Sequence, residues 1–196
     1  MAAYARIPIH REIEDCRICA DHLPHGPRPV VQMSGTARLL IIGQAPGRKV
    51  HETGIPWNDA SGAQLRTWLD MSPDEFYDAS RIAIMPMGFC YPGTGKSGDL
   101  PPRRECAPAW HARLLALMPH IRLTLLIGSY AQRHYLSLSK RSTLTETVAH
   151  YAEFLPQYFP LPHPSPRNRL WLTRNPWFEE QVVPALRQQV HAALAE

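Results

Sequence analysis

The sequence lacks any long apolar segment. No run of about 18 apolar residues occurs among its 196 residues, so we expect nothing in it to span a membrane. Residues 1–16, MAAYARIPIHREIEDC, lack the apolar centre of a secretory signal and carry acidic side chains early. We therefore expect a cytoplasmic protein. A chain of this length suits one domain with a sizeable core.

Lysine is also scarce. Only Lys49, Lys96 and Lys140 stand among the 21 basic residues, and the net charge is +4. The planar arginine side chain suits phosphate groups and base edges, but a GC-rich genome would produce the same bias. The charge therefore permits an anionic partner without requiring one.

Cysteine is limited to four residues. Cys16 and Cys19 form a C-x-x-C pair, whereas Cys90 and Cys106 lie far downstream, each close to prolines or glycines. An intracellular chain of this size needs no disulfides, so the pattern favours ligation of a metal or cluster. Zinc in a tetrahedral site and an iron–sulfur cluster both fit four thiolates. The alternative is four reduced thiols without a ligand.

Four short apolar runs predict buried strands separated by helices. The expected strands are 39–42, 81–87, 122–127 and 158–161. The expected helices lie around 12–15, at 63–69, from 72, and at 108–118, 129–135, 143–154 and 177–195. Strands that alternate with helices predict an α/β fold: a single three-layer α/β/α domain with a central, mainly parallel four-stranded sheet. No repeat or linker divides residues 1–196, and residues 1–36 form an N-terminal arm that carries the first cysteines.

The loops that follow these strands carry most of the candidate functional residues. The stretch 38–62, RLLIIGQAPGRKVHETGIPWNDASG, leaves the first strand at Gly43 and is rich in polar side chains. Ligands of open α/β sheets bind outside the carboxyl ends of the strands. We therefore expect Gln44, Gly88–Phe89, Ser129 and His163 to converge on one edge of the sheet.

Three motifs stand out: the Gly-x-x-Pro-Gly loop at 43–47, the passage from Gly54-Ile-Pro-Trp to Ser-Gly at 54–62, and the late His-Pro-Ser-Pro-Arg-Asn loop at 163–168. Together they resemble the uracil-DNA glycosylase superfamily. The positions of Cys16, Cys19, Cys90 and Cys106 resemble the iron–sulfur branch of that superfamily. The resemblance implies that these cysteines bind a structural [4Fe–4S] cluster, with zinc as the alternative.

The resemblance also implies roles at the site. Trp57 stands where relatives carry a phenylalanine that stacks on a flipped base, and Ala45 and Phe89 are the neighbouring base-binding positions. Asp59 matches an aspartate implicated in catalysis, and His163 matches a histidine that donates to a base carbonyl oxygen. The matched late loop, which relatives press into the minor groove, carries Ser165, Arg167 and Asn168.

Each of these residues also has a structural alternative. Trp57 could be a core aromatic and Asp59 a helix N-cap. His163 could bond to local backbone, and the late loop could be a surface turn stiffened by proline.

The sequence departs from the family pattern at two places. Relatives carry a carboxylate at Gln44 or Ala45, so an acid must come from elsewhere, from Asp59 first and Glu52 second. Gln44 can still hold a base or a water by hydrogen bonds. The asparagine that reads uracil is absent after the second strand, where residues 86–89 are Pro-Met-Gly-Phe. Uracil specificity is therefore open, and hypoxanthine and xanthine are further candidates.

The leading hypothesis is a monomeric DNA glycosylase that acts on a deaminated base in single- or double-stranded DNA. The alternative is a non-catalytic, iron–sulfur-stabilised module that binds damaged DNA or another nucleic acid. A third reading, hydrolysis of a small phosphorylated nucleotide, needs a metal-binding carboxylate cluster, which the sequence does not offer. Formation of abasic sites separates the first hypothesis from the second.

Overall fold

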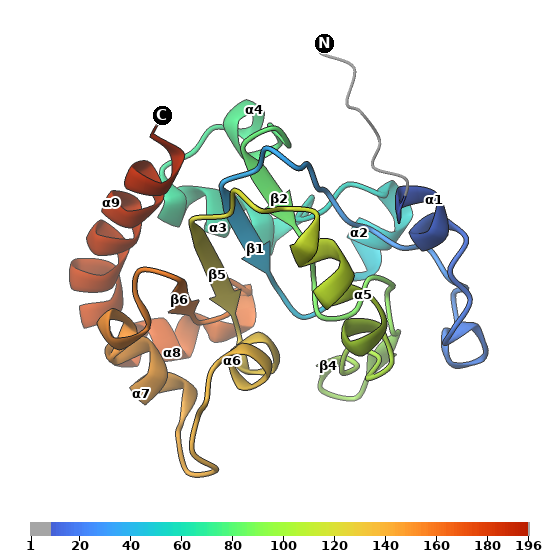
Figure 1. Cartoon of the computed structure of the whole chain (residues 1–196). Helices are drawn as coiled ribbons and strands as arrows, with labels where there is room; N and C mark the ends of the chain where they lie inside the picture. The colour runs from blue at the N-terminus through green and yellow to red at the C-terminus, as the bar shows by residue number, and fades with distance from the viewer. Residues whose placement is uncertain (1–8, 196) are drawn as a thin grey trace.

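Four parallel strands form the centre of the molecule. The computed structural model describes residues 9–195, and its sheet has the order β2-β1-β5-β6 with every pair parallel (Figure 1). The strands are β1 (Leu39–Ile42), β2 (Ile82–Ile84), β5 (Leu123–Ile127) and β6 (Tyr158–Leu161). The predicted α/β class and all four predicted strands are confirmed.

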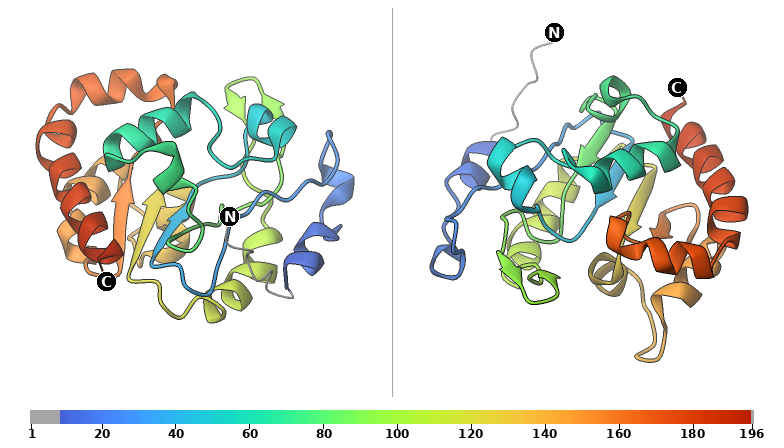
Figure 2. Two further views of the ribbon diagram at one scale, coloured as in Figure 1. Left: turned by 90° about the horizontal axis from the view of Figure 1, so that it is seen from above. Right: turned by 180° about the vertical axis from the view of Figure 1, so that it is seen from behind.

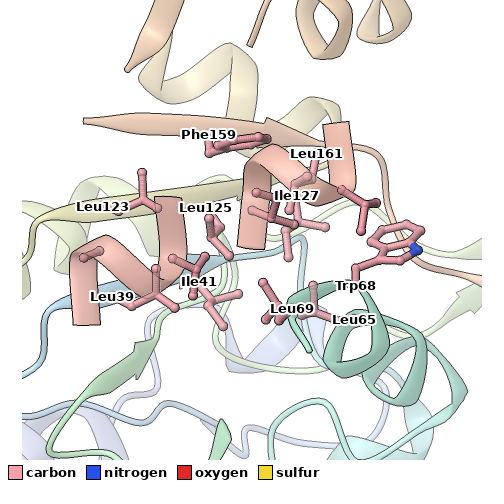
Figure 3. Close-up of a cluster of buried hydrophobic side chains, with 14 of the residues drawn as sticks. Leu39, Ile41, Leu65, Trp68, Leu69, Leu123, Leu125, Ile127, Phe159 and Leu161 are labelled. Carbon is pink, nitrogen blue, oxygen red and sulfur yellow. The ribbon is translucent and has the colours of Figure 1, made fainter. Parts of the chain in front are cut away.

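The sheet is covered on both faces because its central strands are apolar throughout. Leu39 and Ile41 of β1 belong to one core, in which side chains of α3 (Ala60–Leu69) and α9 (Val183–Leu194) pack on the sheet (Figure 3). Leu40 and Ile42 belong to the second core, together with side chains of α5 (Cys106–Ala116). Figure 2 shows the sheet between these helices. The alternation of side chains along one strand thus produces the predicted three layers.

The remaining helices connect or flank the strands. They are α1 (Ile9–Glu14), η1 (Ala20–His22), α2 (Arg48–Thr53), α4 (Pro73–Phe76), α6 (Ser129–Tyr135), α7 (Leu144–Ala149), η2 (Tyr151–Phe154), η3 (Pro166–Asn168), α8 (Arg169–Arg174) and η4 (Phe178–Val182). Thr143 forms a capping box at the start of α7, where a helix was expected from 143, and Ser72 forms another at the start of α4.

Several elements lie in segments expected to be loops. Among them are α2, α8 and a hairpin of β3 (Thr94–Gly95) and β4 (Gly98–Asp99). Of the six residues of α2 only Val50 is buried, so the helix leaves no apolar periodicity in the sequence. It ends at Gly54, whose φ of 72° is left-handed. The carbonyl groups of His51 and Glu52 near its end accept hydrogen bonds from Arg28 of the arm.

The N-terminal arm is held by more than its cysteines. Ile9 and Ile13 are buried in the second core, and Gln32 forms an antiparallel bridge with Ile84 at the edge of the sheet. Glu12 forms a 2.6 Å ion pair with Arg113 of α5. Apolar burial and backbone pairing therefore order this arm; residues 1–8 of the arm lie outside the described part.

Within residues 9–195, no helix combines the length and apolar character that a membrane crossing requires.

Candidate functional site

A pocket opens at the carboxyl ends of β1, β2 and β6, where the topology predicted it. Its free volume is about 250 Å³. It is lined by seven residues predicted from the sequence, namely Gln44, Ala45, Trp57, Asp59, His163, Ser165 and Arg167. Pro86 after β2 and Asp99 of the β3–β4 hairpin also line it. Loops from opposite ends of the chain therefore close around one cavity.

Trp57 forms one wall of the pocket in an unusual backbone conformation. Its φ is 56°, which is rare for a residue other than glycine. Arg66 of α3 donates to the Trp57 carbonyl oxygen at 3.3 Å. A Cβ atom at Gly43 would lie 2.8 Å from the Trp57 ring, so only glycine lets the indole lie this close to the end of β1. Trp57 also packs partly on the first core, so the two interpretations of this residue are compatible.

Asp59 is both a helix cap and a pocket residue. Its Oδ1 accepts a 2.8 Å hydrogen bond from the Gly62 amide, which makes it the N-cap of α3. Its Oδ2 lies on the side of Gly47, where a Cβ atom would be 3.9 Å away. The cap fixes the orientation of the carboxylate, and the second oxygen is left facing the cavity.

His163 is positioned as a neutral hydrogen-bond donor. The Ser165 amide donates to Nδ1 at 3.2 Å, so in the neutral ring the proton is on Nε2. Burial lowers the pKa of His163 below its usual 6.5, although the nearby Asp59 and Asp99 carboxylates raise it. The imidazole lies 5.7 Å from the Trp57 ring, centroid to centroid. A donor therefore stands beside the aromatic wall.

The late loop is organised around His163. The Asn168 side chain donates to the His163 carbonyl oxygen at 2.7 Å, and Ser165 Oγ accepts from the Arg167 amide at 3.3 Å. Arg167 extends across the mouth of the pocket and donates to the carbonyl oxygen of Ser97 in the hairpin, at 3.2 Å. Ser165 and Arg167 thus line the pocket, while Asn168 supports the loop from outside the lining.

Gln44 joins the loop after β1 to the segment that carries the hairpin. Its side-chain Nε2 donates to the Leu100 carbonyl oxygen at 3.1 Å, and its backbone carbonyl oxygen accepts from the Gly88 amide at 3.0 Å. The neighbouring Ala45 presents no polar side chain. This loop therefore contributes an amide and backbone groups to the pocket, but no acid.

Besides Asn168, four predicted residues do not line the pocket, namely Gly88, Phe89, Ser129 and Glu52. The Phe89 ring is 2% exposed in the second core, stacked on His111 at 5.8 Å, so we omit it from the site. Glu52, our second choice of acid, pairs with Arg48 on the outer side of α2 and is not part of the pocket lining.

Asp99 is the pocket residue that the sequence did not reveal. It lies in a Gly/Pro-rich stretch without periodicity or motif, and only the pairing of Thr94 with Asp99 in the hairpin brings it to the cavity. The one available signal was the length of this loop, which is unusual in a compact domain.

The four cysteines line a second, small cavity between the arm, the segment after β2 and α5. The Phe89 amide donates to Cys106 Sγ at 3.3 Å. Burial, with a smaller contribution from the other cysteines, raises the pKa of Cys90 to about 11 and that of Cys106 to about 12. Within residues 9–195, no three His, Cys, Asp or Glu side chains are arranged to hold a metal ion.

The family assignment agrees with this geometry. The chain matches the model of the uracil DNA glycosylase superfamily over residues 31–187, which is most of its length. This match includes the loop after β1, the hairpin and the late loop, and it confirms the resemblance at the level of the superfamily. The chain therefore belongs to the uracil DNA glycosylase superfamily.

Proposed function

We propose that this protein is a DNA glycosylase that hydrolyses the N-glycosidic bond of a deaminated base. One observation carries the proposal: Trp57 and Asp59 of the loop before α3 and His163 of the loop after β6 line a single cavity. An aromatic face, a carboxylate and a neutral donor are the groups that cleavage of a base–sugar bond requires.

The cavity suits a base extruded from DNA. Its volume of about 250 Å³ is small compared with the roughly 300–1,000 Å³ of pockets for drug-sized ligands. We propose that the base stacks on Trp57, as bases do on aromatic side chains in nucleic-acid sites. Ser165 and Arg167 at the mouth would then meet the phosphates beside the extruded nucleotide.

The reaction would divide its charges between two sides of the pocket. As the C1′–N bond breaks, its electron pair moves to the base and positive charge develops on the sugar. His163 Nε2–H donates to a carbonyl oxygen of the departing base and stabilises the negative charge there. Asp59 Oδ2 stabilises the sugar cation and accepts a hydrogen bond from the water that attacks C1′. The water proton then leaves through that carboxylate to solvent or to the base.

We also propose that the four cysteines hold a structural [4Fe–4S] cluster. Four thiolates can hold either a tetrahedral zinc ion or an iron–sulfur cluster, and zinc is the alternative. The four side chains line one cavity, and Cys106 Sγ accepts a backbone hydrogen bond. Four thiolates and an amide donor to sulfur are typical surroundings of an iron–sulfur cluster.

A base panel tests the glycosylase proposal. Purified protein is incubated with oligonucleotides that carry one uracil, hypoxanthine or xanthine, single- and double-stranded, and alkali-labile abasic sites are measured. We expect product with at least one base, and large losses of rate for Asp59→Asn and His163→Ala. Asp74→Asn, in the exposed first turn of α4, removes the same charge away from the pocket and should act like wild type. DNA binding without product across the panel would instead indicate the binding module.

A further inference from the structure

Asp99 brings a second carboxylate into the pocket. It stands at the end of β4, and its Oδ1 accepts a hydrogen bond from Thr94 Oγ1 at 3.3 Å. Thr94 in turn bonds to the hydroxyl group of Tyr91, whose side chain is 1% exposed. The hairpin is thus anchored on a buried aromatic, and Asp99 is oriented by that anchor.

The carboxylates of Asp99 and Asp59 approach the same point from different loops. A Cβ atom at Gly47 would lie 3.3 Å from Asp99 Oδ2 and 3.9 Å from Asp59 Oδ2. Each Oδ1 is engaged by its own loop, Asp59 by the Gly62 amide and Asp99 by Thr94. The two free oxygens therefore face a shared space beside Gly47, and their negative potentials add there.

Asp99 is placed for the sugar rather than for the base. It is exposed, so it lies toward the mouth, whereas Trp57 and His163 are partly buried. A base that stacks on Trp57 leaves its sugar nearer the mouth. A carboxylate beside the base would oppose the negative charge of the leaving group, but beside the sugar it stabilises the opposite charge. Bound DNA would cover Asp99 and strengthen this interaction by excluding water.

We infer that Asp99 is a second catalytic carboxylate, which acts with Asp59 on the positive charge that develops at the sugar. This inference rests on the glycosylase proposal above. It assigns to the hairpin the acid that the loop after β1 lacks at Gln44 and Ala45. It also explains why glycine stands at position 47, since a side chain there would enter the space between the two carboxylates.

Two abasic-site analogues isolate the charge of the sugar. A pyrrolidine analogue in DNA carries a positive charge at the sugar position, and a tetrahydrofuran analogue has a similar shape without the charge. We expect wild-type protein to bind the pyrrolidine oligonucleotide more tightly. Asp99→Asn should reduce that preference about 10-fold, with tetrahydrofuran binding unchanged, and should lower kcat more than it changes KM. Asp74→Asn should leave the preference for the pyrrolidine oligonucleotide and the values of kcat and KM as in wild type.

Combining Asp99→Asn with Asp59→Asn tests whether the carboxylates act as a unit. If the two substitutions change the preference for pyrrolidine in a non-additive way, both carboxylates act on the same charge at the sugar. Binding of the tetrahydrofuran oligonucleotide serves as the folding control for each variant. The inference is overturned if Asp99→Asn weakens both analogues equally or neither, while wild type still releases a base. No preference in wild type, together with no abasic product, would overturn the glycosylase proposal itself.

Discussion

The pocket and the cysteine cavity share one segment of the chain but are held in different ways. In the pocket, hydrogen bonds within the protein fix Asp59, His163 and Gln44. In the cysteine cavity, the four cysteines stand among mostly apolar neighbours, and burial raises the pKa of Cys90 and Cys106. The fold alone therefore pre-organises the first region, whereas the second has the composition of a region completed by an added group.

The segment from β2 to α5 connects the two regions. Cys90 and Cys106 at its ends line the cysteine cavity, while Asp99 near its middle lines the pocket. If the cysteines hold a cluster, its loss should consequently reach the pocket through the hairpin. It should affect Asp99 more than Asp59, which is fixed by the cap of α3.

The largest effect is expected from Cys106→Ala. If a cluster is bound, anaerobically purified wild type should be brown with absorbance near about 400 nm. The variant should lose this colour and more than about 4 kcal/mol of unfolding free energy, as expected for loss of a structural metal group. Spectra and denaturant unfolding measure both, and chelator-treated wild type is the matched control. Colourless wild type that is no more stable than the variant would contradict the cluster.

The next largest effect is expected at His163, which lies in the pocket and not in the cysteine cavity. His163→Ala should lower kcat about 10²- to 10³-fold, since it removes one donor to the leaving base. Because burial lowers the pKa of His163 below 6.5, the neutral ring persists as the pH falls through 6.5. Activity should decline only at lower pH, where the imidazolium loses its hydrogen bond from Ser165. A decline that begins above pH 6.5 would contradict this role.

A third prediction concerns His111, which lies beneath both regions. Its Nε2 is 3.0 Å from the Pro86 carbonyl oxygen, its Nδ1 is 2.6 Å from the Tyr135 hydroxyl group, and its ring stacks on Phe89. Burial lowers the pKa of His111 from 6.5 to about 4. The unfolded chain therefore binds a proton that the folded protein excludes, and stability falls as the pH drops from 6.5 toward 4.

The expected loss over that range is about 3 kcal/mol. Urea unfolding between pH 7 and 4 measures it. In His111→Gln the slope over this range should become shallower, although the variant is less stable at pH 7. His120→Gln, at an exposed position, serves as the control and should keep the wild-type slope. An unchanged slope in His111→Gln would show that another group carries the acid sensitivity.

The sequence predicted the sheet well because burial on both faces leaves continuous apolar runs such as 39–42. It predicted Thr143 and Ser72 as helix starts because a capping box is a local pattern. It could not predict Asp99, since a hairpin of four paired residues in a Gly/Pro-rich stretch leaves no periodicity. The prediction for Phe89 was wrong for a related reason. Its position after β2 places the residue near the carboxyl edge of the sheet, but it does not determine where the side chain points.

Asp59 shows a different limit of sequence reasoning. The helix cap and the functional residue were treated as alternatives, but Asp59 caps α3 and lines the pocket at the same time. A short motif cannot separate such roles, because each oxygen is assigned only by the three-dimensional position of its partner.

The smallest effect is expected at the support of Trp57, and it sharpens the contrast between the two regions. Tyr77 donates to the Pro56 carbonyl oxygen at 2.9 Å, and Arg66 donates both to Tyr77 and to Trp57. Tyr77→Phe removes one hydrogen bond, worth about 1 kcal/mol, from a backbone already held at a positive φ.

Because we propose that Trp57 stacks on the base and does not touch the breaking bond, Tyr77→Phe should raise KM up to about 5-fold and leave kcat nearly unchanged. Steady-state kinetics on the preferred oligonucleotide measures this split, and Tyr130→Phe on the exposed surface of α6 is the matched control. A fall in kcat that equals the rise in KM would mean that the loop carrying Trp57 also sets the position of Asp59. Pre-organisation of the pocket would then depend on this network as much as on the cap of α3.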